Sequence, residues 1–180
     1  MPFFNLIRTR RSVRAFTAAP LDKETVDLLV EAALRAPSSR SLCPWEFVVV
    51  DQADTIAALA KAKPHGAGFL AGAPLAIVVA ADPARCDVWV EDAAIATTFI
   101  HLAAHSLGLG SCWIQLRQRR HDSGISSEDY VREVLGIPDS RRVLSMVAVG
   151  HPRQQPPGHA YDSLLTEKVF TNRYGAPRQR

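Results

Sequence analysis

The sequence predicts an α+β fold, a three-layer α/β/α sandwich in which helices flank both faces of a sheet. Residues 75–80 are apolar throughout, which is typical of a strand covered on both faces. Residues 26–34 and 90–107 instead repeat apolar side chains at the three- and four-residue spacing of helices. With 180 residues, 47% of them hydrophobic, the chain has the length and composition of one globular domain.

The first part of the chain predicts two helices and a strand. Apolar residues within 3–7 predict a short helix, and Asp22 is placed to cap a longer helix that ends at Pro37. A loop rich in hydroxyl groups follows. Trp45 then opens an apolar strand that runs to Val50.

The middle of the chain predicts a small helix, a flexible stretch and a buried helix. Residues 54–63 are rich in alanine, and glycines make 66–72 a flexible connection. The helix at 90–107 is apolar on nearly all sides, so we expect it at the centre of the fold and buried against a second subunit as well. Its Glu91 and Asp92 lie in the first turn, where the helix dipole favours carboxylates.

The last elements are two strands and a capped helix. Residues 111–115 read as a buried strand that follows the glycine-rich end of the long helix. Ser126 or Ser127 caps a helix that Gly136 stops. Residues 143–149 form the last strand.

From residue 151 onward the chain is rich in proline, glycine and polar residues and cannot form a core of its own. The segment Lys168-Val169-Phe170-Thr171-Asn172-Arg173-Tyr174-Gly175 nevertheless carries apolar side chains that require burial. We therefore expect a domain of residues 1–150 and an extended C-terminal arm of residues 151–180 that packs on a partner subunit.

Three guanidinium groups and a hydroxyl lie in one short turn formed by Arg10, Arg11, Ser12 and Arg14. Guanidinium groups match phosphate oxygens, so the turn is a candidate site for a phosphate monoester. A basic run is also typical of a solvated surface or a nucleic-acid contact, and the turn alone leaves these alternatives open. The net charge of +3 is too small to indicate nucleic-acid binding, and we expect no nucleic-acid partner.

Other reactive side chains predict no further site. His101 and His105 are four residues apart, but no third ligand is evident, so we expect packed or surface histidines and no metal. Cys43, Cys86 and Cys112 are odd in number and widely spaced, which predicts neither disulfides nor zinc and fits a cytoplasmic protein. Charged residues interrupt the longest apolar region, and we expect neither a signal peptide nor a membrane contact.

Short motifs spread over nearly the whole chain resemble, in the same order, those of the FMN-dependent nitroreductase family. The matching segments are Arg10-Arg11-Ser12-Val13-Arg14-Ala15-Phe16, Ala36-Pro37-Ser38-Ser39, Pro44-Trp45-Glu46-Phe47, Glu91-Asp92-Ala93, Gly108-Leu109-Gly110-Ser111-Cys112-Trp113-Ile114-Gln115, Leu135-Gly136-Ile137-Pro138 and Val147-Ala148-Val149-Gly150-His151-Pro152. Each motif is common, but their shared order is specific.

The resemblance implies a mixed, mainly antiparallel sheet and a homodimer that holds FMN at its interface. The implied activity is transfer of a hydride from NADH or NADPH through FMN to a small organic acceptor, such as a nitroaromatic or a quinone. The two substrates would use one face in turn, by a ping-pong mechanism. A dehalogenase, a flavin-fragmenting enzyme or an azoline oxidase of the same fold remains an alternative. The alternative from another class is a non-enzymatic anion or nucleic-acid binder.

The resemblance also assigns roles to the basic turn. Arg10 and Ser12 would bind the phosphate and ribityl chain of FMN, joined by Arg11 and by Arg173 from the arm. Arg14 would lie near the N1 and O2 edge of the flavin. No residue is implied as a nucleophile, because the cofactor carries the chemistry.

Two further segments complete the implied cofactor site. The backbone N–H groups of Gln115 and Leu116 would reach flavin N5 and O4. The other subunit would contribute Pro37, Ser38 and Ser39, and Ser41 is a further expected cofactor contact. Ser41 stands where many family members have Asn, and Cys43 where many have Gln or a basic residue.

Overall fold

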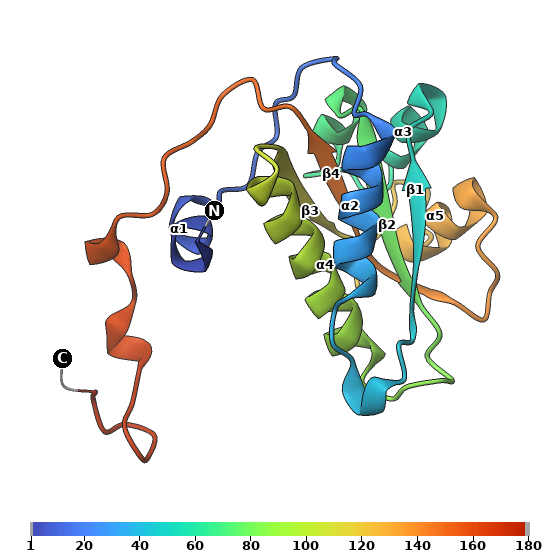
Figure 1. The fold of residues 1–180 in the computed structure, drawn as a ribbon. Coiled ribbons are helices and arrows are strands. Elements are labelled where there is room, and N and C mark those ends of the chain that lie inside the picture. Colours follow the sequence, from blue (N-terminus) through green and yellow to red (C-terminus); the bar gives the residue numbers. More distant parts are fainter. Residues whose placement is uncertain (1, 179–180) are drawn as a thin grey trace.

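The computed structural model describes residues 2–178, which form a four-stranded sheet between two layers of helices (Figure 1). The helices are α1 (Phe3–Thr9), α2 (Lys23–Leu34), α3 (Ala53–Leu59), α4 (Trp89–Ser106) and α5 (Ser127–Leu135). The strands are β1 (Trp45–Val50), β2 (Leu75–Ala81), β3 (Gly110–Gln115) and β4 (Arg142–Gly150). Short 3-10 helices occupy Ser39–Ser41, Gly68–Gly72, Tyr161–Ser163 and Thr166–Lys168. The predicted α+β sandwich is confirmed.

The strands lie in the order β1-β2-β4-β3, and every neighbouring pair is antiparallel. A single parallel bridge joins Ser12 to Ser111 at the outer edge of β3. The four strands are therefore all antiparallel, and the sheet is mixed only because the segment that contains Ser12 pairs with β3 in parallel. β2 and β4 occupy the middle of the sheet.

Each face of the sheet has its own core. Ile77 of β2 packs toward Ile100 of α4 on one face, while Val78 packs toward Val131 of α5 on the other. Figure 1 shows the two layers, with α2 and α4 in front of the sheet and α3 and α5 behind it. Because neighbouring side chains of β2 point to opposite, covered faces, the whole strand is apolar.

Local signals set several helix ends as predicted. The side chain of Asp22 accepts a hydrogen bond from the N–H of Thr25 at 2.7 Å, and that of Ser126 accepts one from Asp129 at 2.9 Å. Gly136 ends α5 with φ of +66°, a left-handed conformation that glycine adopts without strain. These contacts confirm the predicted caps.

Two segments differ from the prediction. α3 ends at Leu59, before the expected residue 63, because Lys61 and Ala62 bond carbonyls three residues back and Pro64 disfavours a helical residue before it. Residues 66–72 are not a flexible connection, since Leu70 is fully buried in the 3-10 helix there. Ala67 is fully buried as well, and Phe69 packs against the same core.

The chain beyond β4 leaves the sheet and runs past α1, as the orange to red ribbon in Figure 1 shows. Most of its large apolar side chains are exposed, from Val169 at 43% to Tyr174 at 92%, and Phe170 is half-buried. α4 is the longest described helix, and Ile95 on it and Leu107 just after it are also exposed. No helix within residues 2–178 is long and apolar enough to cross a membrane.

Candidate functional site

The basic turn lies along the free edge of β3. The N–H of Val13 donates to the carbonyl oxygen of Ser111 at 2.9 Å, next to the Ser12 bridge. A Cβ atom at Gly110 would lie 2.7 Å from a methyl carbon of Val13, so only glycine allows this close approach. The sequence of β3 therefore fixes the position of residues 10–14.

Positive charges gather around Cys112. Burial raises the pKa of the Cys112 thiol, and the nearby charges of Arg14, Lys63 and Arg10 act in the opposite direction. The thiol is 1% exposed, as expected for a small core residue. Burial, and then the charge of Arg119, lowers the pKa of Lys63. Sequence reasoning missed Lys63, because only the fold brings it to β3.

The backbone of Gln115 faces outward from the sheet. Leu116 donates its N–H to Leu144 at 3.1 Å, so Leu116 and Leu144 form a hydrogen-bonded pair of the antiparallel ladder. Gln115 and Ser145 are then a non-hydrogen-bonded pair, whose N–H and C=O groups point away from each other. The outward carbonyl of Gln115 accepts from the ammonium of Lys63 at 3.1 Å. Its N–H remains directed at the open edge.

The N–H groups of Gln115 and Leu116, which were both expected at the flavin, therefore point in different directions. The N–H of Leu116 points into the sheet, and its side chain is fully buried. The side-chain amide of Gln115 is fixed from both ends, since its oxygen accepts from the Trp113 indole at 2.9 Å and its nitrogen donates to the Arg117 carbonyl at 3.1 Å. Of these two N–H groups, that of Gln115 points to the open edge of the sheet and that of Leu116 does not.

The hydroxyl-rich loop is a tight turn held by two contacts. Ser39 donates its N–H to the carboxylate of Asp92 at 2.8 Å, and Ser38 accepts from the N–H of Cys43 at 2.9 Å. Asp92 is thus buried under the turn, a role that its place in the first turn of a helix did not predict. Arg40 forms an ion pair with Asp87 and joins the turn to the loop before α4.

Backbone strain is concentrated in the candidate segments. Within residues 2–178, five non-glycine residues have positive φ, a conformation that costs on the order of 1–3 kcal/mol each. They are Arg40, Ser41 and Cys43 in the turn, Gln118 after β3, and Asn172 beside Arg173. Strain of this kind persists where the surroundings impose it, and it clusters at binding sites.

The hydroxyl-rich turn that contains Ser38 and Ser39 lies far from residues 10–14 within one chain. The hydroxyl of Thr9, just before the basic turn, contacts His105 near the end of α4 at 2.8 Å, whereas Asp92 holds Ser39 near its start. Thirteen residues of helix separate the two contacts by about 20 Å. One chain alone therefore does not bring the hydroxyl-rich turn and residues 10–14 into one site.

Arg11 bonds the arm in this chain, and Arg173 makes no described contact with the basic turn. The guanidinium of Arg11 donates to the carbonyl of Pro157 at 2.6 Å and so ties the arm to the basic turn. Arg173 lies in the arm, where its N–H bonds the carbonyl of Thr171. Within the described residues no hydrogen bond or ion pair joins Arg173 to residues 10–14.

The two histidines of α4 support the basic turn. His101 contacts the hydroxyl of Ser111 at 2.7 Å, and burial together with the charge of Arg10 lowers its pKa to about 4. Burial and Arg10 lower the pKa of His105 as well. The described chain holds no group of three potential metal ligands, and these histidines are packed side chains.

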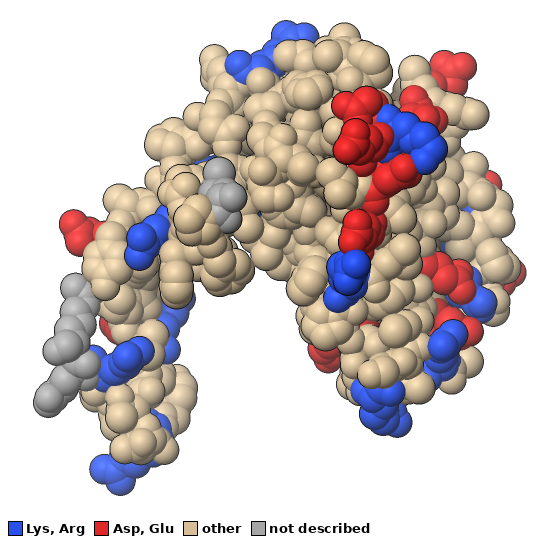
Figure 2. All heavy atoms as spheres, in the orientation of Figure 1, with Lys and Arg blue, Asp and Glu red and all other residues tan. Residues whose placement is uncertain are grey.

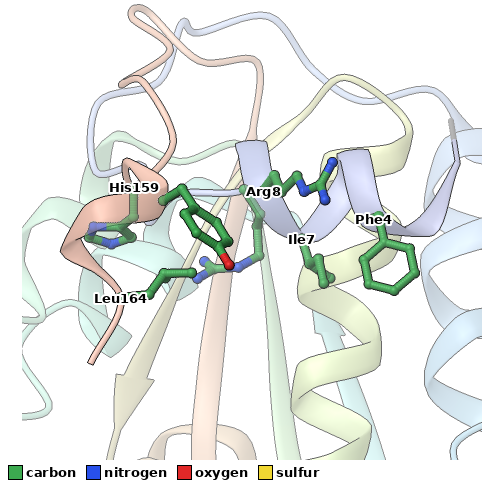
Figure 3. A pocket seen from close by; sticks show the side chains of 7 residues that line it. Phe4, Ile7, Arg8, His159 and Leu164 are labelled. Carbon is green, nitrogen blue, oxygen red and sulfur yellow. The ribbon is translucent and has the colours of Figure 1, made fainter. Parts of the chain in front are cut away.

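A cavity of about 470 Å³ lies between α1 and the arm (Figure 3). Its lining is mostly apolar, and Arg8 and Arg10 supply its guanidinium groups. Figure 3 shows Ile7 and Leu164 on its facing walls, one from α1 and one from the arm. The cavity is thus a groove between two segments that touch little else in the chain.

Together, the segments at the edge of β3 suit a ligand with a phosphate group and a flat polar edge. Arg10, Arg14 and Lys63 provide cations, and no ion pair within residues 2–178 occupies them. The N–H of Gln115 provides a fixed donor for a ring nitrogen or oxygen. Such a set binds and orients an anion, and it contains no nucleophile paired with a base.

Comparison with known proteins gives a consistent result. The family model described as "Nitroreductase family" matches residues 7–65 and 56–151. The FMN-dependent nitroreductase of Clostridium difficile R20291 has a TM-score of 0.93 and 40% identity, over 96% of this chain and 100% of that one.

Two further proteins are more distant. A protein of Archaeoglobus fulgidus, whose name provisionally assigns it as an NADH dehydrogenase or NAD(P)H nitroreductase, is 36% identical over 83% of this chain and 85% of its own length. The NADPH:FMN oxidoreductase of Vibrio harveyi, solved in complex with NAD+, has a TM-score of 0.79 and 27% identity over 95% of this chain and 77% of that one. All three similarities extend over most of the chain.

Proposed function

This chain belongs to the nitroreductase family of NAD(P)H-dependent oxidoreductases, and we propose that it uses FMN to reduce a small organic acceptor such as a nitroaromatic or a quinone. Bound FMN supplies a ring that accepts a hydride at N5 and carries the electrons from one substrate to the other. NAD(P)H and the acceptor would occupy the same open face in turn, a ping-pong order.

The observation that carries the proposal is the outward N–H of Gln115 beside a group of cations. An edge-strand N–H is held rigidly by the ladder on the other side of its strand, so it can orient a ring nitrogen without reorganisation. Arg14 and Lys63 lie within electrostatic reach of the same strand. The donor set therefore fits a flavin, whose reduced form carries negative charge that nearby cations stabilise.

Residues 10–14 would hold the phosphate end of FMN. Arg10 and Ser12 would bind the phosphate and ribityl chain, with Arg11 beside them and Arg173 reaching in from an arm. Arg14 would face the N1 and O2 edge, and its guanidinium lies 5.8 Å from the ring centre of Phe69, a contact that orients it.

The second half of the site would come from a second copy of the chain. The distance of about 20 Å along α4 supports this, because Pro37, Ser38, Ser39 and Ser41 lie near the opposite end of that helix from residues 10–14. Of the two N–H groups first expected at the flavin, that of Gln115 is oriented for the role. The N–H of Leu116 would have to share its bond to Leu144.

We also propose that the chain forms a homodimer, in which residues 1–150 make the domain and residues 151–180 pack on the partner. Figure 2 shows the arm as a separate lobe, with an open gap between it and the body. Between Ala93 and Ser106, α4 carries no Asp, Glu, Lys or Arg, and its Ile95 is exposed. A second copy would bury these apolar surfaces.

The first test is the visible absorption spectrum of the purified protein, followed by chromatography of whatever acid releases from it. We expect a yellow protein that yields FMN and loses its colour under NADH or NADPH without oxygen. Reoxidation by a panel of nitroaromatics, quinones and halogenated phenols would then identify the acceptor class. A colourless protein that does not bind added FMN would contradict the proposal.

A further inference from the structure

The basic loop, residues 117–120, has no part in the proposed site and carries three arginines: Arg117, Arg119 and Arg120. Several other arginines of the described chain lie in ion pairs: Arg35 with Glu31, Arg132 with Asp129, and Arg141 with Glu46. Within residues 2–178 no carboxylate lies within ion-pair distance of the three arginines of the basic loop. Their charge is therefore available to an anion.

The basic loop is a fixed structure rather than a solvated strand end. Arg117 donates its N–H to Leu144 at 3.0 Å, and the carbonyl of Arg119 accepts from the N–H of Ser127 at 2.9 Å. Between them, Gln118 is held at φ of +60°, which strains a residue with a side chain. A rigid loop loses little conformational freedom when it binds a ligand.

The basic loop adjoins the outward edge of Gln115. The positive charge of Arg119 helps to lower the pKa of Lys63. The ammonium of Lys63 in turn donates to the carbonyl of Gln115. Arg117 is held over the indole of Trp89, 5.8 Å from the ring centre, and also lies near Glu128. Arg119 and Arg120 are exposed, and their guanidinium groups donate only to nearby backbone carbonyls, those of Gln118 and Gly124 respectively, among the described residues. These two side chains are therefore free to contact a substrate phosphate.

We propose that Arg119 and Arg120 bind the 2′-phosphate of NADPH and make NADPH the preferred reductant, an inference that rests on the proposed function. NADPH differs from NADH only by that phosphate. Guanidinium groups bind phosphate through paired, charge-assisted hydrogen bonds. Neutral or paired side chains at these positions would accept both nucleotides alike, whereas two unpaired guanidinium groups distinguish them.

The test compares the two nucleotides in the FMN-loaded protein. We expect the second-order rate constant for anaerobic flavin reduction to favour NADPH by about tenfold or more, because charge-assisted hydrogen bonds have effects of that order. Arg119→Ala and Arg120→Ala should each remove most of this preference and leave the value for NADH unchanged. Lys23→Ala, which removes an exposed charge at the start of α2, should leave both values unchanged.

A second measurement does not depend on turnover. Adenosine 2′,5′-bisphosphate should bind the protein about tenfold or more tightly than adenosine 5′-monophosphate, as measured by calorimetry, and Arg119→Ala should abolish the difference. Equal binding of the two adenosine nucleotides would overturn the inference. If neither NADH nor NADPH reduces the flavin, the proposed function fails, and the calorimetric comparison still decides whether the basic loop binds a 2′-phosphate.

Discussion

The carboxylate of Asp92, buried at the start of α4, accepts a hydrogen bond from the backbone N–H of Ser39 at 2.8 Å. Its second oxygen accepts from the thiol of Cys86 at 3.3 Å. One buried carboxylate thus holds a turn in which three residues have positive φ. The strain of the turn persists because Asp92 and Ser38 fix it from two sides.

Replacing Asp92 with Ala should lower the free energy of unfolding by about 1–3 kcal/mol, because the Ser39 N–H is left without its acceptor. Asp92→Asn is the matched control, since it keeps one acceptor oxygen at nearly the same volume. Urea denaturation of the two variants checks this. Equal losses for Ala and Asn would show that the charge, rather than the contact, stabilises the turn.

Arg10→Ala should weaken FMN binding by roughly 10- to 100-fold while the fold and the dimer persist, because a charge-assisted phosphate contact contributes about 1.5–3 kcal/mol. Fluorescence titration of the apoprotein with FMN measures the change in Kd. Arg8→Ala is the control, since Arg8 is a neighbouring arginine of α1 to which we assign no FMN contact. Unchanged FMN affinity in Arg10→Ala would remove that residue from the phosphate site.

Gly110→Ala should displace the basic turn, because its Cβ would lie 2.7 Å from Val13, and we expect a loss of about 1–3 kcal/mol in stability together with weaker FMN binding. The double variant with Val13→Ala should recover much of the loss, since the smaller side chain frees the space. Gly72→Ala, which has no atom within 4 Å of its Cβ, should be close to neutral. Thermal unfolding of these three variants and of Val13→Ala alone tests the contact, and additive losses in the double variant would argue against it.

Local signals were sufficient to predict much of the fold. Asp22, Ser126 and Gly136 act on residues three or four positions away, so their caps can be read from the sequence. The hydrogen bond between Asp92 and Ser39 joins residues 53 positions apart, and the spacing of apolar residues along the sequence does not predict such a contact. Lys63 was missed for the same reason. The mainly antiparallel direction of the strands was predicted from the family resemblance alone, because an apolar strand has the same pattern in either direction. The strand order was not predicted.

Stability should fall as the pH drops from about 6.5 toward about 4. His101 stays neutral in the folded state, since burial and Arg10 lower its pKa to about 4, whereas the unfolded chain protonates it near 6.5. The unfolded state then binds more protons in this window, and His101 contributes a slope of at most about 1.4 kcal/mol per pH unit, to which His105 adds because its pKa is also lowered. His101→Asn, which retains a group for Ser111, should reduce the slope in denaturation curves measured at several pH values. An unchanged slope would exclude His101 as its source.

A mixed dimer tests whether each FMN site uses two copies of the chain. Arg10→Ala damages residues 10–14, and Ser39→Trp blocks the turn without removing the N–H that Asp92 binds. Each variant alone should bind FMN poorly, because both of its sites carry one lesion. If the sites are shared, a dimer of the two variants has one site with both lesions and one with neither. Unfolding and refolding an equal mixture should therefore restore about a quarter of all sites, as flavin absorbance measures. Sites built within a single chain would show no recovery, because every site would still carry one lesion.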